Sequence, residues 1–293
     1  MAQDLLSGDA RSLARAMSLV ENGAPEAEAL LDRIYGARPP APRVGMTGPP
    51  GAGKSTLVAE YALLLRRLGR RVGVVAVDPT SPFTGGAILG DRVRMSELST
   101  DPGVFIRSMA TRGSLGGLAG RTEELCELLS AWGSDVTLIE TVGVGQSELD
   151  VAQAADTTVV VLTPESGDAI QSLKAGLMEI ADVFVVNKAD HAGADQLAAA
   201  IRSALALRPA SPPRLPRVAM LRMKTPGSVE SSLMRTRSPR IAPPVKGLVG
   251  STATTPTRRP KRRSRSAYSA TSVLFPAPGG PVMPTRGAGG RDP

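Results

Sequence analysis

Hydrophobic and polar residues follow a repeating order of strand, loop and helix along residues 43–208. Strand-like runs rich in Val and Ile fall at 43–47, 72–77, 136–139, 158–162 and 183–186. Apolar residues at helical spacing fall at 55–68, 121–132, 169–181 and 194–207. This alternation predicts an α/β fold with a mostly parallel sheet flanked by helices. Ligands of such folds bind at the carboxyl ends of the strands.

Both ends of the chain depart from this order. Leu13, Met17 and Val20 share one helical face, and similar spacing recurs near Leu30. We therefore expect residues 1–42 to form a short helical extension that ends in a Pro-rich linker. Residues 209–293 are rich in Arg, Pro and Ser and keep neither period, which predicts a disordered tail. Residues 43–208 between them are the predicted domain.

Charge divides the chain at the same place. The whole sequence has a net charge of +8, but residues 209–293 hold 16 Lys and Arg against two acids. Residues 1–208 hold 19 Lys and Arg against 25 Asp and Glu. A nucleic-acid role would therefore rest on the tail alone, where only Tyr268 and Phe275 offer rings for base stacking. Nucleic acid is not an expected partner.

Several functional classes are disfavoured by what the sequence contains. Asp4 and Asp9 interrupt the start of the chain, so we expect no signal peptide. No run approaches the roughly 18 apolar residues that span a bilayer, so we expect a soluble cytoplasmic protein without membrane contact. Cys126 and His191 are the single cysteine and histidine, which argues against a disulfide or a zinc site. Cys126 is expected to be a buried small hydrophobe.

A phosphate-binding loop follows the first predicted strand and precedes a helix. It fits G-x-x-x-x-G-K-[ST] and comprises Gly48, Pro49, Pro50, Gly51, Ala52, Gly53, Lys54, Ser55 and Thr56. Main-chain N–H groups of such a loop point toward phosphates, and the helix dipole adds attraction for anions. Lys54 is expected to reach the β- and γ-phosphates, and the Ser55 hydroxyl to bind Mg²⁺.

A second motif, Asn187-Lys188-Ala189-Asp190, follows the strand at 183–186. In N-K-x-D, the Asp carboxylate accepts from two donors on the edge of guanine. Adenine would leave that carboxylate unpaired, which is costly. Alone the tetrapeptide is compatible with a simple turn, but downstream of a phosphate loop it indicates that GTP or GDP is the ligand.

Acidic residues near the strand ends are candidates for the metal and the chemistry. Glu140 and Asp78 end strands, and Asp91 follows a Gly-rich loop. Carboxylate oxygens suit Mg²⁺, although a helix or turn cap is the alternative for Asp78 and Asp91. The Gly143 N–H can meet a γ-phosphate. Gln146 can orient the attacking water, or can serve equally as a structural polar residue.

These motifs together resemble a known family, the methylmalonyl-CoA mutase-associated GTPases of the MeaB/ArgK type, within the SIMIBI class of P-loop proteins. The resemblance runs from about Ser12 to Arg208. The stretches that support it are 18–22, 47–56, 76–79, 84–91, 113–117, 140–148 and 187–190. The run Glu-Thr-Val-Gly-Val-Gly-Gln-Ser-Glu at 140–148 is distinctive among P-loop proteins.

The resemblance implies a GTPase that uses Mg²⁺ and acts as a metallochaperone for an adenosylcobalamin-dependent acyl-CoA mutase, typically as a homodimer. By matching position, Lys54 and Ser55 serve the phosphates and Mg²⁺, and Asn187, Lys188 and Asp190 hold guanine. The matching acidic metal and catalytic set is Asp78, Asp91 and Glu140. The segment 167–174 matches a mobile switch that contacts the mutase, with Asp168 and Lys174 as candidates for partner-triggered catalysis.

The sequence departs from the family after Arg208. A guanine-contacting loop, a final strand and a dimerisation arm are expected there, and no match to them is recognisable. The tail is typical of GC-rich DNA translated out of frame; a genuine disordered basic tail and a nucleic-acid-binding arm are the alternatives. Two other functions stay open: a P-loop kinase of the ArgK type, and a guanine nucleotide-binding module with impaired hydrolysis.

Overall fold

A computed structural model describes residues 1–78, 96–110, 117–141, 147–165, 177–206, 217–225 and 228–233. The helices are α1 (Ala2–Leu6), α2 (Ala10–Asn22), α3 (Pro25–Ile34), α4 (Lys54–Arg67), α6 (Ser96–Ser99), α7 (Gly117–Trp132), α8 (Ser147–Ala154), α10 (Met178–Ile180) and α11 (Ala194–Ala206). The strands are β1 (Arg43–Thr47), β2 (Val72–Asp78), β3 (Val104–Ala110), β4 (Val136–Thr141), β5 (Thr157–Leu162), β6 (Val183–Val186), β7 (Arg217–Thr225) and β8 (Ser228–Leu233).

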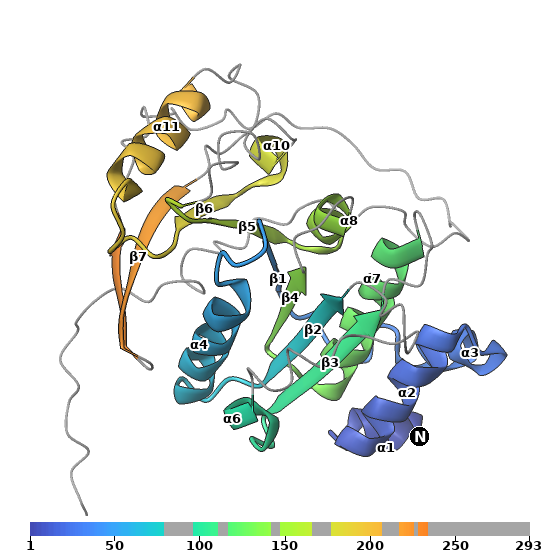
Figure 1. Cartoon of the computed structure of the whole chain (residues 1–293). Coiled ribbons are helices and arrows are strands. Elements are labelled where there is room, and N and C mark those ends of the chain that lie inside the picture. The colour runs from blue at the N-terminus through green and yellow to red at the C-terminus, as the bar shows by residue number, and fades with distance from the viewer. Residues whose placement is uncertain are drawn as a thin grey trace, which may run out of the picture. The chain divides into compact units, whose positions relative to one another are not determined.

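One sheet organises these elements (Figure 1). Its strand order is β3-β2-β4-β1-β5-β6-β7-β8, and every neighbouring pair is parallel except β7 with β8. The chain leaves β1 toward β2 on one side, whereas it leaves β5 toward β6 on the other. The sheet therefore has a switch point between β1 and β5, where α/β folds bind their ligands. The α/β prediction is confirmed.

Two apolar clusters pack the helices onto the sheet. The first joins α1, α2, α3, α7 and α8 to inward residues of β2 and β4, including Val75 and Ile139. The second joins α11 and the short α10 to β5, β6 and β7 around Phe184. With an aromatic content of 3%, the sheet faces are built mainly from Val, Leu, Ile and Ala, as the composition predicts.

The N-terminal helices form a layer against α7 and β3. Asp9 caps α2 by accepting a hydrogen bond from the Ser12 N–H at 2.7 Å. The Glu21 carboxylate pairs with the Arg107 guanidinium on β3, and this bond raises the pKa of Arg107. The Trp132 indole N–H donates to the Gly8 carbonyl at 2.9 Å. The predicted helical extension at residues 1–42 thus forms, and it includes α1 as an additional short helix.

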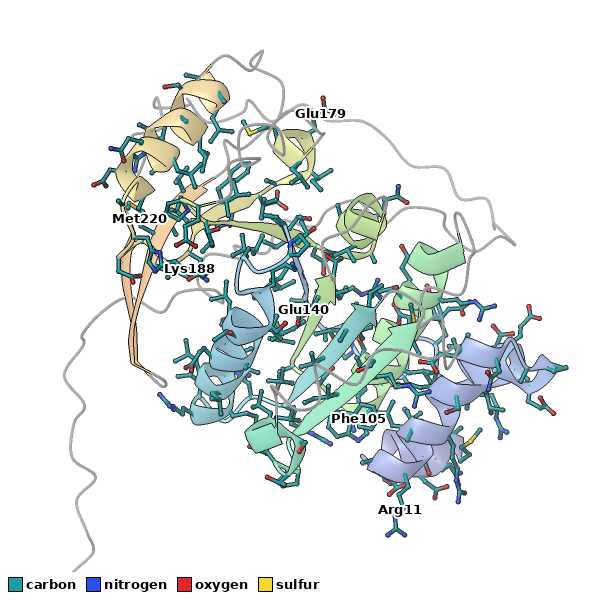
Figure 2. The ribbon with its side chains drawn as sticks, in the orientation of Figure 1. Arg11, Phe105, Glu140, Glu179, Lys188 and Met220 are labelled. Atoms are coloured by element: carbon teal, nitrogen blue, oxygen red, sulfur yellow. The ribbon has the colours of Figure 1, made fainter. Side chains whose placement is uncertain are left out.

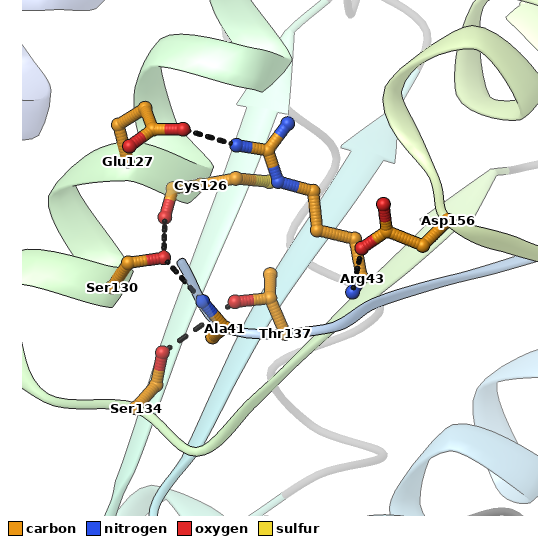
Figure 3. A network of polar contacts seen from close by, with 8 residues as sticks. All are labelled: Ala41, Arg43, Cys126, Glu127, Ser130, Ser134, Thr137 and Asp156. Carbon is orange, nitrogen blue, oxygen red and sulfur yellow. Dashed lines mark hydrogen bonds and ion pairs between the residues drawn. The ribbon is translucent and has the colours of Figure 1, made fainter. Parts of the chain in front are cut away.

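A polar network ties together the other end of the sheet, where β1 begins (Figure 3). Arg43 donates from Nη2 to the Glu127 carboxylate of α7 at 2.6 Å, and from its main-chain N–H to Asp156 at 2.9 Å. Ser130 Oγ accepts from the Ala41 N–H at 3.1 Å and donates to the Cys126 carbonyl. This network fixes the linker before β1 against α7.

Cys126 is fully buried beside that network, as its sequence context predicts. Burial raises the pKa of its thiol to about 12. A thiol that stays protonated is a poor nucleophile, so Cys126 acts as a core residue.

The structure contains strands that the sequence pattern did not predict. The run 104–110 forms β3 at the sheet edge, although Arg107 at its centre interrupts its apolar pattern. Residues 217–225 and 228–233 form β7 and β8 inside the segment expected to lack structure. Because Val218–Leu221 is a short apolar run between basic residues, the Arg-rich composition around it hides the strand. The sheet therefore continues beyond Arg208 with β7, which pairs parallel with β6.

The predicted helix at 169–181 falls largely outside the described residues, which contain only α10 from it. None of the helices in the described part of the chain is long and apolar enough to cross a membrane.

Candidate nucleotide-binding site

The loop between β1 and α4 is shaped by glycines. Gly48 has φ 137° and Gly53 has φ 89°, both in the region that favours glycine. A Cβ on Gly48 would collide with the main chain of Val161, and one on Gly53 with the side-chain amide of Asn187. The loop thus lies directly against β5 and the loop after β6, which requires glycine at both places.

Lys54 is buried at the first position of α4, with 5% of its surface exposed. Its ammonium donates to the carbonyl of Gly48 at 2.9 Å and to the carbonyl of Pro49 at 3.0 Å. The side chain therefore folds back over the loop, with its charge at the loop's centre. Phosphate oxygens are stronger acceptors for an ammonium than neutral carbonyls are, so they can replace these contacts.

Ser55 and Glu140 meet although 85 residues separate them in sequence. The Ser55 hydroxyl donates to Oε1 of Glu140 at 2.5 Å, and both residues are buried. Glu140 lies near the end of β4, where its Cα pairs with that of Met46 on β1 (Figure 2). Beside it, Thr141 Oγ1 donates to Thr47 Oγ1 at 3.1 Å. The start of α4, which follows β1, and the end of the adjacent strand β4 thus bring the Ser55 hydroxyl and the Glu140 carboxylate together.

This pair fits a magnesium ion in its chemistry. Mg²⁺ takes oxygen ligands, usually one or two from protein, and fills the remaining positions with water and substrate phosphates. Ser55 Oγ and a Glu140 carboxylate oxygen are such ligands, already 2.5 Å apart. Within the described ranges, no cluster of three or more His, Cys, Asp or Glu residues has metal-site spacing. Two oxygen ligands from the protein leave the other positions to water and phosphates, so the pair is suited to a nucleotide-associated ion.

Asn187 joins the base-reading loop to the phosphate loop. Its side-chain amide donates to the Ala52 carbonyl at 2.8 Å, and its main-chain N–H donates to Leu162 on β5 at 2.8 Å. The next residue, Lys188, has φ 53° and is the one non-glycine in the described chain with positive φ. The Ala189 N–H donates to the Leu221 carbonyl on β7. The unexpected β7 therefore contacts the loop predicted to read guanine.

A charged group that the motifs did not predict lies beside that loop. Glu165, in the turn after β5, accepts from Nδ1 of His191 at 2.5 Å and lies 3.6 Å from the ammonium of Lys188. The hydrogen bond from His191 is the main cause that lowers the pKa of Glu165. His191 Nε2 lies 3.5 Å from the Asp190 carboxylate. No short sequence motif links Glu165 to His191, because 26 residues separate them.

The structure brings together the predicted residues Lys54, Ser55, Glu140 and Asn187 at the carboxyl ends of β1, β4 and β6. Lys188 lies beyond the end of β6, on the same edge of the sheet (Figure 2). The main chain of Asp78 ends β2, which pairs with β4. The side chain of Asp78 lies outside the described part of the structure, as do Asp91, Gly143, Gln146, Asp168 and Lys174.

Comparisons with known proteins agree with this geometry. Residues 13–229 match the family model described as methylmalonyl Co-A mutase-associated GTPase MeaB. A Pyrococcus horikoshii protein named as a GTPase is 58% identical over 195 residues, which are 67% of this chain and 62% of that protein. The GTPase ArgK of Escherichia coli is 46% identical over 190 residues, which are 64% of this chain and 57% of that protein.

A crystal structure of a LAO/AO transport system kinase superposes with a TM-score of 0.60 at 35% identity. The match covers 75% of this chain and 66% of that one. The aligned part of this chain spans 57% to 62% of the length of the two curated relatives above.

Proposed function

Since the chain belongs to the methylmalonyl Co-A mutase-associated GTPase family MeaB, we propose that it binds guanine nucleotides and hydrolyses GTP to GDP and phosphate. The observation that carries the proposal is the Asn187–Ala52 hydrogen bond of 2.8 Å, which holds the base-reading loop against the phosphate loop. One nucleotide of guanine size can then contact both loops. The buried Ser55–Glu140 pair supplies the magnesium ligands at the phosphate end.

In the proposed reaction, the protein contributes positioning and charge. The phosphate loop surrounds the β- and γ-phosphates with N–H groups, and Lys54 transfers its hydrogen bonds from two carbonyls to phosphate oxygens. Ser55 and Glu140 would hold Mg²⁺, with Asp78 and Asp91 as further candidates; the ion neutralises charge that develops on the phosphates. Gly143 is proposed to meet the γ-phosphate, and Gln146 to orient water.

The proposed biological role is that of a metallochaperone for an adenosylcobalamin-dependent acyl-CoA mutase. Its support is the association with methylmalonyl Co-A mutase that the family's name states, together with the resemblance of 167–174 to a switch segment. In this proposal, Asp168 and Lys174 respond to the mutase and accelerate hydrolysis when it is bound. The nucleotide state then sets the strength of the association, as in other switches controlled by a γ-phosphate.

A P-loop kinase is the second candidate, because a matched solved structure is named a LAO/AO transport system kinase. A guanine nucleotide-binding module with impaired hydrolysis is the third. The three functions differ in where the γ-phosphoryl group goes: to water, to an acceptor molecule, or nowhere.

The test uses the purified full chain with Mg²⁺ and GTP or ATP. We expect free phosphate from GTP and almost none from ATP, with hydrolysis faster when a mutase is added. Asp190→Asn is the matched control: xanthine carries a carbonyl where guanine carries an amino group, so the variant should prefer XTP. A phosphorylated acceptor without free phosphate would establish the kinase. Nucleotide binding by calorimetry without turnover, even with the mutase, would establish the impaired module.

A further inference from the structure

Four charged or titratable side chains form a chain of contacts beyond the ends of β5 and β6. Lys188 Nζ lies 3.6 Å from Oε2 of Glu165, while Oε1 of Glu165 meets Nδ1 of His191 at 2.5 Å. His191 Nε2 lies 3.5 Å from Oδ2 of Asp190. Charges of opposite sign therefore alternate when His191 is protonated. Two members of the chain, Lys188 and Asp190, belong to the motif that reads guanine.

These contacts cross between two loops. Glu165 follows β5, and the other three residues follow β6, its parallel neighbour. Within the β6 loop, the His191 N–H donates to the Lys188 carbonyl at 3.0 Å, which closes a turn. Glu165 therefore restrains both ends of that turn from outside it. The turn itself includes the left-handed main chain of Lys188.

The exposure of these side chains limits what the contacts can do. Glu165 and Asp190 are about half exposed at 55% and 53%, and Lys188 and His191 are 39% and 41% exposed. Ion pairs this accessible to water add little to folding stability. Their geometry can still fix the direction of a carboxylate that must accept two hydrogen bonds at once. Orientation, rather than stability, is the role that remains.

We infer that Glu165 and His191 are positioning residues for guanine: Glu165 holds Lys188 directly and, through the His191 ring, orients the Asp190 carboxylate. This inference rests on the proposed function, because Asp190 must read guanine for its orientation to matter. A carboxylate has about four lone-pair positions, and the two guanine donors occupy only one on each oxygen. His191 can therefore stay beside Asp190 while the base is bound.

Protonation of the His191 ring decides whether both contacts can form. A neutral imidazole donates from one nitrogen only, whereas the imidazolium donates from both. With Nδ1 donating to Glu165, Nε2 can donate to Asp190 only in the charged form. The charged groups facing the ring in the described part of the chain are Glu165, Asp190 and, through Glu165, Lys188. The lowered pKa of Glu165 keeps its carboxylate ionised at neutral pH.

The test compares GDP with IDP by calorimetry at pH 6 and at pH 8, for the full chain and for Glu165→Gln and His191→Gln. IDP lacks the amino group of guanine, so it donates one hydrogen bond to Asp190 instead of two and tolerates a misdirected carboxylate. We expect the original chain to bind GDP more tightly at pH 6 than at pH 8.

Each variant should lose about three- to tenfold in GDP affinity at pH 6, the loss expected of one net hydrogen bond. IDP affinity should change less, and the pH dependence should disappear. Glu28→Gln, at an exposed position on α3, is the matched control and should behave like the original chain. Urea unfolding midpoints should agree for all four proteins.

Three outcomes would overturn the inference. Variants that bind GDP like the original chain at both pH values would show that Glu165 and His191 do not affect the base. Equal losses for GDP and IDP, unchanged with pH, would indicate a merely structural role. If the original chain binds neither GDP nor GTP, the proposed function fails and the inference fails with it; GDP binding without effects of the variants removes the inference alone.

Discussion

The two ends of the central sheet bury charged side chains to the same extent but give them different partners. Where β1 begins, Arg43 is 6% exposed and pairs with the Glu127 carboxylate. Where β1 ends, Lys54 is 5% exposed and donates to the carbonyls of Gly48 and Pro49 in its own loop. Arg43 and Lys54 therefore do not differ in burial. They differ in the chemistry of their partners.

At the start of β1, the contacts come from distant parts of the chain, and one of them, between Arg43 and Glu127, pairs opposite charges. Arg43 and Glu127 are 84 residues apart, and Arg43 and Asp156 are 113 apart. Such contacts need no ligand and hold three elements together. At the end of β1, the Lys54 ammonium donates to the carbonyls of Gly48 and Pro49, six and five residues away. Phosphate oxygens are stronger acceptors for an ammonium and can replace these carbonyls. The Arg43–Glu127 ion pair, in contrast, ties β1 to α7 without a ligand.

The largest expected effect is that of Lys54→Met, which keeps the length of the side chain and removes its charge. Loss of a preorganised donor to the transferring phosphoryl group lowers turnover on the order of 10²- to 10³-fold. Because the hydrogen bonds described above go to neutral carbonyls, we expect the free energy of unfolding without nucleotide to change by less than about 1 kcal/mol. Phosphate release and urea unfolding measure the two quantities.

Lys54→Arg provides the control, since it keeps the charge but not the compact ammonium. It should recover nucleotide binding in part and turnover little. A Lys54→Met protein that unfolds several kcal/mol more easily without nucleotide would contradict the contrast drawn between the two ends of the sheet.

Arg43→Met should have the opposite effect: a loss of folding stability with no change in GDP affinity. Removing one partner of a buried pair typically costs about 3–5 kcal/mol. We expect less here, about 2–3 kcal/mol, because the Glu127 side chain is 30% exposed and keeps contact with water. The change also removes the Arg43 Nε–H, which has no hydrogen-bond partner in the described structure. Urea unfolding measures the loss, and GDP affinity below the unfolding transition should be unchanged.

Arg43→Met combined with Glu127→Leu tests the cause. If the isolated carboxylate is what destabilises the single variant, an apolar replacement at both positions restores most of the stability. A single variant as stable as the original chain, or one that loses GDP affinity while folded, would show that the network at the start of β1 is not a separate structural frame.

The sequence predicted the loops after β1 and β6 because their patterns lie in short, contiguous stretches; that these loops bind a nucleotide stays a prediction. The glycines and the lysine of residues 48–56 lie in one local pattern, as do the polar side chains of residues 187–190, and each stretch directly follows a strand. The five predicted strands formed, and all but the first, at 43–47, are short runs dominated by β-branched residues. Ser55 and Glu140 were each predicted to serve Mg²⁺, one from the phosphate-loop motif and one from its place at a strand end, but no local pattern links two residues 85 positions apart.

The two strands β3 and β7 depend on contacts with residues distant in the sequence, which local patterns do not contain. β3 has Arg107 at its centre, and this residue is accommodated only because Glu21 of α2 lies opposite. The buried part of β7 is four residues, Val218–Leu221, within an Arg- and Pro-rich segment, and its partner β6 gives it a place in the sheet. Composition averaged over residues 209–293 hid a strand that supports the guanine loop.

The smallest effect is expected for Asn187→Ala, which lies at the nucleotide end but has a partner within the protein. Its amide donates to the Ala52 carbonyl, so we expect the variant to lose some folding stability and some GDP affinity. Losing one such bond should cost about 1 kcal/mol of stability, and GDP affinity should fall about fivefold because the two loops are no longer joined.

Asn187→Asp is the stricter variant: it fills the same space but sets a carboxylate against the carbonyl oxygen. Calorimetry with GDP and urea unfolding of both variants are the measurements. A loss of affinity alone would place Asn187 with Lys54, as a residue that serves the ligand. A loss of stability alone would place it with Arg43, and would show that the frame extends into the nucleotide site.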